Sequence, residues 1–118
     1  MIQSYRDLVV WQKAMDLTIE IYKLIKNMPK EETFALSDQI RRAAVSIPSN
    51  IAEGQGRVTA KDFIRFLSMA RGSLCEHSTQ IELCERLNYL ERSQTTPIHD
   101  QISEIAKMLY ALANSVHD

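Results

Sequence analysis

The chain has 118 residues, of which 45% are hydrophobic and 25% are charged, with three Gly and three Pro. This length and composition are those of one globular domain, and they exclude two ordinary domains and extensive disorder. The formal net charge of −1 excludes a generally cationic chain, so any nucleic-acid binding would need a local basic patch.

Two further features bear on where the protein works. The N-terminal residues lack the continuous apolar stretch of a secretory signal, and the longest apolar run, Met108 to Ala113, is far below the roughly 20 residues that span a membrane. Cys75 and Cys84 fall on opposite sides of one predicted helix and cannot pair with each other. We therefore expect a cytoplasmic protein with free thiols and no membrane contact.

The first predicted helix covers about residues 7–27 and ends before Pro29, because the residue ahead of a proline disfavours the α conformation. Its polar side chains occupy only about 100° of the helical wheel, and most of the remaining arc is apolar. An isolated bundle would leave part of that arc exposed, unless the N-terminal segment or the following loop covers it. We favour a second subunit, and the candidate interface residues are Val10, Leu17, Leu24 and Met28.

The second predicted helix covers about residues 37–53, from an N-cap at Ser37 to the residue before Gly54. Pro48 lies inside it, where its ring lacks a donor and clashes with the carbonyl of Ala44. The helix should therefore kink or restart at this point. Three neighbouring polar residues are suited to pair with the freed backbone groups: Ser46, Ser49 and Asn50.

The remaining helices are predicted at about residues 60–88, capped by Thr59, and at about residues 97–116. The last of these should begin with Thr96 as its cap and Pro97 at its first position. Apolar residues recur at helical spacing in every segment, and the connections are short. The sequence therefore predicts an all-α domain over residues 1–118, an antiparallel up-down-up-down four-helix bundle.

The sequence contains no pattern that is typical of a metal or cofactor site. Glu53 and Glu76 could serve acid–base or metal chemistry, but surface roles are commoner for such carboxylates. No histidine has a glutamate three residues before it, as a di-iron bundle requires, and no zinc or phosphate-loop spacing occurs. We predict no catalytic residue, metal or cofactor.

Three residues of the third helix allow alternative interpretations. His77 falls on its apolar face, which favours a hydrogen-bonded core histidine over a ligand or base. Arg71 and His77 together loosely match the Arg-x(4–6)-His signature of all-α ribonucleases of the HEPN type, which keeps a ribonuclease among the hypotheses. Gly72, in the middle of the same helix, would let a second backbone approach closely, within the bundle or from another subunit.

Basic residues are concentrated between residues 37 and 71. A solvated helix face explains them, but symmetry could gather several copies around an axis, and the combined field would then hold phosphate groups. No aromatic platform accompanies them, so base-specific recognition is not indicated. The candidate nucleic-acid contacts are Arg41, Arg42, Arg57, Lys61 and Arg65.

Three segments resemble a known family: YRDLVVWQKA at residues 5–14, QIRRAAVSIPSNIAEGQGR at 39–57 and FIRFLSMARGSLCE at 63–76. They are similar to the four-helix bundle proteins encoded in intervening sequences of bacterial large-subunit ribosomal RNA genes. That family includes the accessory variability-determinant proteins of diversity-generating retroelements. The resemblance spans nearly the whole chain, and its most specific part is the run SIPSNIAEG, which holds Pro48, Asn50, Glu53 and Gly54.

The resemblance implies a bacterial protein with an accessory, non-enzymatic role, which assembles into a ring that is a homopentamer in characterised relatives. It also implies a partner, since the retroelement relatives bind a reverse transcriptase and nucleic acid through basic surfaces. This chain departs from them in being slightly acidic. Three hypotheses follow: an oligomeric scaffold with weak affinity for RNA or DNA, an adaptor that holds a protein partner on an apolar ring surface, and a ribonuclease.

Overall fold

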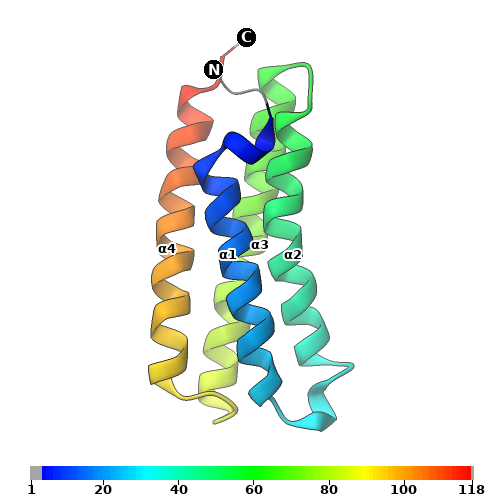
Figure 1. Ribbon diagram of the computed structural model, residues 1–118, viewed down its shortest axis with the longest axis vertical. Coiled ribbons are helices and arrows are strands. Elements are labelled where there is room, and N and C mark those ends of the chain that lie inside the picture. Colours follow the sequence, from blue (N-terminus) through cyan, green and yellow to red (C-terminus); the bar gives the residue numbers. More distant parts are fainter. Residues whose placement is uncertain (1–3, 118) are drawn as a thin grey trace.

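The computed structural model describes residues 4–117, and within this range the chain forms four α-helices, short 3₁₀ turns and no strand. The helices are α1 (Val9–Leu24), α2 (Leu36–Gln55), α3 (Ala60–Arg86) and α4 (Arg92–Ser115). They lie side by side along the long axis, and the α2–α3 connection is at the same end as the last turn of α4 (Figure 1). The α1–α2 and α3–α4 connections lie at the opposite end. The all-α fold class is confirmed.

A single apolar core runs the length of the bundle, and every helix contributes one buried stripe to it. The side chains of this stripe recur at spacings of three and four residues, which is the period that places them on one face of a helix. In the described part of the chain, no helix is long and apolar enough to cross a membrane. The largest fully buried apolar side chains are Leu17, Ile21, Ile40, Ile47, Ile51, Leu67, Ile81, Ile105 and Leu109.

The start of α3 agrees with the sequence prediction, and the starts of α2 and α4 differ from it. Thr59 caps α3 as predicted, because its Oγ1 accepts a hydrogen bond from the amide of Asp62 at 3.1 Å. Ala35, rather than Ser37, is the N-cap of α2, which begins one residue early. At α4 the prediction was wrong by five residues, since Glu91 is the cap and its amide donates to Oε1 of Gln94 at 2.9 Å.

α2 runs unbroken from Leu36 to Gln55 through Pro48, so the restart that the sequence allowed at this point does not occur. Pro48 has no N–H to offer the carbonyl of Ala44, but the hydroxyl of Thr18 in α1 lies 3.2 Å from that oxygen. The same hydroxyl lies 2.8 Å from the carbonyl of Ala14, so it bridges the two helices. The side-chain amide of Asn50 donates instead to the carbonyl of Ser46 at 2.8 Å, which is not the carbonyl that Pro48 frees. A neighbouring helix thus supplies the contact that Pro48 removes.

Gly54 allows α2 and α3 to pack closely near their connection. A Cβ atom built at Gly54 would lie 2.6 Å from Cβ of Phe66 and 3.0 Å from Cδ1 of Phe63, which is closer than real contacts allow. Gly72 has the opposite environment, because a Cβ atom there would meet nothing within 4 Å. The close approach expected at Gly72 is therefore absent within the described chain and occurs at Gly54.

Candidate interaction surface

The flank of α1 that faces α2 carries apolar side chains that the chain leaves exposed. Met15, Ile19 and Tyr22 of α1 are 37%, 51% and 43% exposed, and Val45 of α2 is 41% exposed. Ile19, Tyr22 and Val45 line a surface groove of about 510 Å³, which we call the α1–α2 groove. Its lining is formed by Thr18, Ile19, Tyr22, Lys23, Lys26 and Val45. Apolar side chains that gather on one surface in this way are typical of an interface.

The candidate interface residues named from the sequence lie elsewhere. Val10, Leu17, Leu24 and Met28 are 4%, 0%, 9% and 8% exposed, and all belong to the core of their own chain. The apolar arc of α1 is wider than its own bundle covers, as the helical wheel indicated. A helical wheel gives the width of the apolar arc but does not show which part of the arc faces the other helices. The four residues named from the sequence lie on the part that faces inward. This part of the prediction is corrected.

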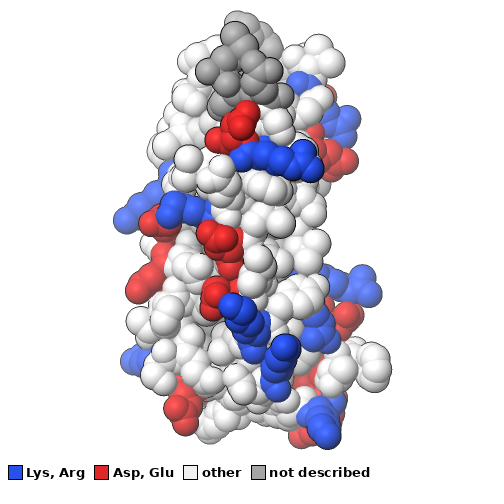
Figure 2. Space-filling model, viewed as in Figure 1, with Lys and Arg blue, Asp and Glu red and all other residues white. Residues whose placement is uncertain are grey.

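The basic candidate residues do not form one patch on the chain. Arg41 and Arg42 lie in the second turn of α2, whereas Arg57, Lys61 and Arg65 lie at the α2–α3 connection and the start of α3. At a rise of about 1.5 Å per residue, the length of α2 separates the two groups by roughly 24 Å. Figure 2 shows Lys and Arg scattered among Asp and Glu on the face it presents.

Most of these cations already have partners. Three arginines form exposed ion pairs with acids three or four residues earlier: Arg42 with Asp38 at 2.8 Å, Arg57 with Glu53 at 3.6 Å, and Arg65 with Asp62 at 3.6 Å. Arg41 donates to the carbonyl of Thr33 at 3.3 Å. Exposed pairs of this kind contribute little to stability and are readily exchanged for a phosphate.

The group at the α2–α3 connection has a more ordered geometry, and we call Arg57, Lys61 and Arg65 the basic corner. The guanidinium groups of Arg57 and Arg65 each lie 4.6 Å from the ring centroid of Phe66. Cation–π contacts of this kind restrain a long side chain and place its charge. Phe66 lies in α3, whereas Arg57 lies in the loop before it, so the stacking depends on how that loop folds back on the helix.

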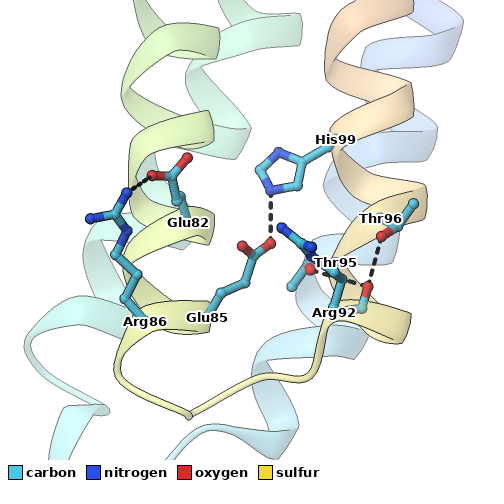
Figure 3. A network of polar contacts seen from close by, with 7 residues as sticks. All are labelled: Glu82, Glu85, Arg86, Arg92, Thr95, Thr96 and His99. Carbon is cyan, nitrogen blue, oxygen red and sulfur yellow. Dashed lines mark hydrogen bonds and ion pairs between the residues drawn. The ribbon is translucent and has the colours of Figure 1, made fainter.

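A polar network joins the end of α3 to the start of α4 (Figure 3). Nε2 of His99 lies 2.9 Å from Oε1 of Glu85, and Arg86 is paired with Glu82 at 2.8 Å. Hydrogen bonding from Thr95 and then from His99 lowers the pKa of Glu85 below its ordinary value. The network fixes α4 against α3 beside an open pocket of about 760 Å³. Glu85 and His99 are 14 residues apart in the sequence, so their contact is seen only once α3 and α4 are packed together.

The two residues of the ribonuclease hypothesis have different environments. His77 is fully buried, and its ring nitrogens find no hydrogen-bond partner among residues 4–117. Burial lowers the pKa of His77 to about 4. Arg71 is exposed, with its guanidinium 5.9 Å from the ring centroid of Tyr110. A substrate on the surface does not reach His77, so this pair does not form a catalytic site in the fold described.

The other carboxylates named from the sequence also have surface environments. Glu53 is exposed and paired with Arg57, and Glu76 is exposed on α3. Across the described residues, no group of three or more His, Cys, Asp or Glu side chains is arranged to hold a metal ion. The features left to consider are surfaces, namely the apolar α1–α2 groove and the cationic basic corner.

These features define the class of all-α bundle proteins. Within it, residues 6–111 match the family described as 23S rRNA-intervening sequence protein, and the chain belongs to this family. A crystal structure from Bacteroides thetaiotaomicron VPI-5482, described as a protein with unknown function from the S23 ribosomal protein family, is similar over the same fold. It is 31% identical in sequence, with a TM-score of 0.83, and the match covers 90% of this chain and 99% of that one. No curated protein matches the chain.

Proposed function

We propose that the protein is a non-enzymatic scaffold or accessory protein that works as a homo-oligomer. In this proposal, copies of an antiparallel up-down-up-down bundle associate through the α1–α2 groove into a ring, which is a homopentamer by analogy with characterised relatives. The observation that supports it is the cluster of half-exposed apolar side chains at Met15, Ile19, Tyr22 and Val45. Fully burying one such side chain stabilises by about 1.5–3 kcal/mol. Because these side chains are about half exposed, roughly half of that free energy could still be gained at an interface.

The native mass across a range of concentrations tests this proposal. We expect sedimentation of the wild-type chain as a discrete oligomer, and of Ile19→Glu as a monomer with an unchanged helical spectrum. The matched control is Leu83→Glu, because Leu83 is 45% exposed on α3, away from the groove. A wild-type chain that remains monomeric at high concentration would overturn the proposal. If that monomer co-purified with another protein bound at Ile19, the adaptor hypothesis would replace it.

A second function, weak RNA binding, is supported by the basic corner. The stacking of Arg57 and Arg65 on Phe66 places two charges near Lys61, and symmetry would repeat this group around a ring. We expect a shift of labelled single-stranded RNA that weakens as salt increases. Changing the three basic residues to Ala should lower the slope of log affinity against log salt by about 2, at roughly 0.7 per phosphate contact.

The control for RNA binding is the pair Arg41→Ala and Arg42→Ala, at the opposite end of α2. If only the basic corner binds RNA, this pair leaves the salt slope unchanged, whereas a slope lowered equally by both sets of substitutions would indicate non-specific attraction. The absence of any shift at low salt would refute RNA binding but would leave the scaffold proposal intact.

A further inference from the structure

Phe34 is unusually exposed for an aromatic residue. It lies in the connection between α1 and α2, which projects at the end of the bundle (cyan in Figure 1), and 95% of its surface is accessible. An aromatic side chain that remains in water does not gain the large favourable free energy that comes from burying its apolar surface. Single exposed apolar residues are common, but an almost fully exposed phenyl group is a strong candidate for an anchor at an interface.

The segment that carries Phe34 is held in place on both sides. The amide of Ala35 donates to the carbonyl of Glu32 at 3.0 Å, and the side chain of Arg41 donates to the carbonyl of Thr33 at 3.3 Å. The hydroxyl of Tyr89 donates to Oε2 of Glu32 at 2.8 Å, which ties the connection to the α3–α4 end. Phe34 is thus presented on an ordered backbone, and an ordered anchor loses less conformational entropy on binding.

The α1–α2 groove has the chemistry that would accept this anchor. Its lining combines the apolar side chains of Ile19, Tyr22 and Val45 with Lys23 and Lys26. Lys23 is paired with Glu20 at 3.5 Å within its own helix. The segment before Phe34 carries an exposed carboxylate at Glu31. The Phe34 segment therefore combines an aromatic side chain with a nearby carboxylate. The groove combines apolar side chains with lysines, which is the complementary chemistry. Within one chain the two do not meet, because Phe34 is almost entirely exposed.

We propose that Phe34 of one copy inserts into the α1–α2 groove of a second copy, with Glu31 beside Lys26 of that copy. This inference rests on the proposed self-association and adds the residue that fills the groove. Anchor and groove are different surfaces, so the contact is heterologous, and such contacts generate a ring when the rotation closes. The other highly exposed apolar residue, Val58, is flanked by Arg57 and lies near Lys61, so its charges would oppose the lysines of the groove.

The first experiment compares Phe34→Ala with Val58→Ala by analytical ultracentrifugation. Both residues are almost completely exposed, at 95% and 98%, so neither substitution should change the melting temperature of the bundle. Phe34→Ala removes one buried phenyl contact, so it should raise the dissociation constant between subunits by about 10- to 100-fold. Val58→Ala should leave the constant unchanged.

A mixing experiment identifies the groove as the receptor for Phe34. Phe34→Ala retains the groove, and Ile19→Glu retains the anchor, so each should be monomeric alone while an equimolar mixture forms a complex of one chain of each. Glu31→Lys should weaken assembly, and the double variant Glu31→Lys with Lys26→Glu should restore it. Failure of the mixture to associate would overturn the inference.

The outcomes separate this inference from the proposed function. If Phe34→Ala assembles as tightly as the wild-type chain while Ile19→Glu does not, the groove is an interface and Phe34 does not fill it. If the wild-type chain itself is monomeric at high concentration, self-association fails, and with it both proposals. If Val58→Ala weakens assembly and Phe34→Ala does not, the anchor lies in the α2–α3 connection at the other end of the bundle, and the inference is overturned.

Discussion

The buried imidazole of His77 predicts that the bundle loses stability as the pH falls through a defined window. In the unfolded chain the pKa of a histidine is about 6.5, and in the bundle burial lowers the pKa of His77 to about 4. Between these values the unfolded state binds a proton that the folded state does not. The free energy of unfolding therefore decreases as the pH falls from 6.5 to 4, and it is unaffected by His77 above that range.

The size of the effect follows from the two pKa values. One pKa unit corresponds to about 1.4 kcal/mol, so the difference between 6.5 and about 4 amounts to roughly 3 kcal/mol at the acid end. A domain of this size has about 5–15 kcal/mol of stability in total, so the loss is easily measured. Glu85 acts in a separate window, because its pKa is lowered below 4.5 and its contribution is lost only as the pH falls through that lowered value.

The assay is urea unfolding at several pH values between 7 and 4, at a fixed protomer concentration so that association contributes equally. His77→Leu should flatten the curve between pH 6.5 and 4 and should stabilise the chain at pH 7 by about 1 kcal/mol, because an unpaired buried polar group is removed. The control is His117→Gln, since His117 is exposed at the C-terminal end. An unchanged slope in His77→Leu would show that this imidazole is not the group that titrates.

Four further substitutions test the packing of the bundle by urea unfolding at pH 7. Gly54→Ala should destabilise the chain by about 1–3 kcal/mol because its Cβ overlaps α3, whereas Gly72→Ala, which meets open space, should be neutral or stabilising by up to about 1 kcal/mol. Thr18→Val should cost about 1–3 kcal/mol, since it leaves the carbonyl of Ala44 without a donor. Thr59→Ala should cost about 1 kcal/mol through loss of the α3 cap, and equal stabilities for Thr59→Ala and the wild-type chain would contradict the cap.

The features that could be predicted from the sequence are those that depend on near neighbours along the chain. Apolar periodicity gave the helices of residues 4–117, and the hydroxyl at Thr59 gave the start of α3 to the residue. The start of α4 was wrong because Thr96 and Pro97 form a typical helix start. The structure instead places the cap at Glu91, whose amide is bonded to Gln94, and Thr96 donates its hydroxyl to the carbonyl of Arg92.

The features that could not be predicted depend on which helix lies beside which. Residues 85 and 99 form a close pair only because α3 and α4 are packed together at that level. The basic candidates lie close together along the chain, yet the length of α2 separates them into two groups. The exposure of Phe34 also depends on the tertiary structure, because a phenylalanine in a short connection is usually buried against the core.

The rotation of α1 links the SIPSN motif of α2 to the groove. Pro48 leaves the carbonyl of Ala44 without a backbone donor, and Thr18 lies beside that carbonyl only when α1 has its observed rotation. Ile19 follows Thr18 by about 100° on the helix, which places it outside α2. Turning α1 to bury Ile19 would withdraw the hydroxyl from Ala44, at a cost of about 1–3 kcal/mol, and would expose Leu17. The exposed apolar flank is therefore coupled to the hydrogen bond between Thr18 and Ala44, and the second copy proposed above would cover the flank with that bond intact.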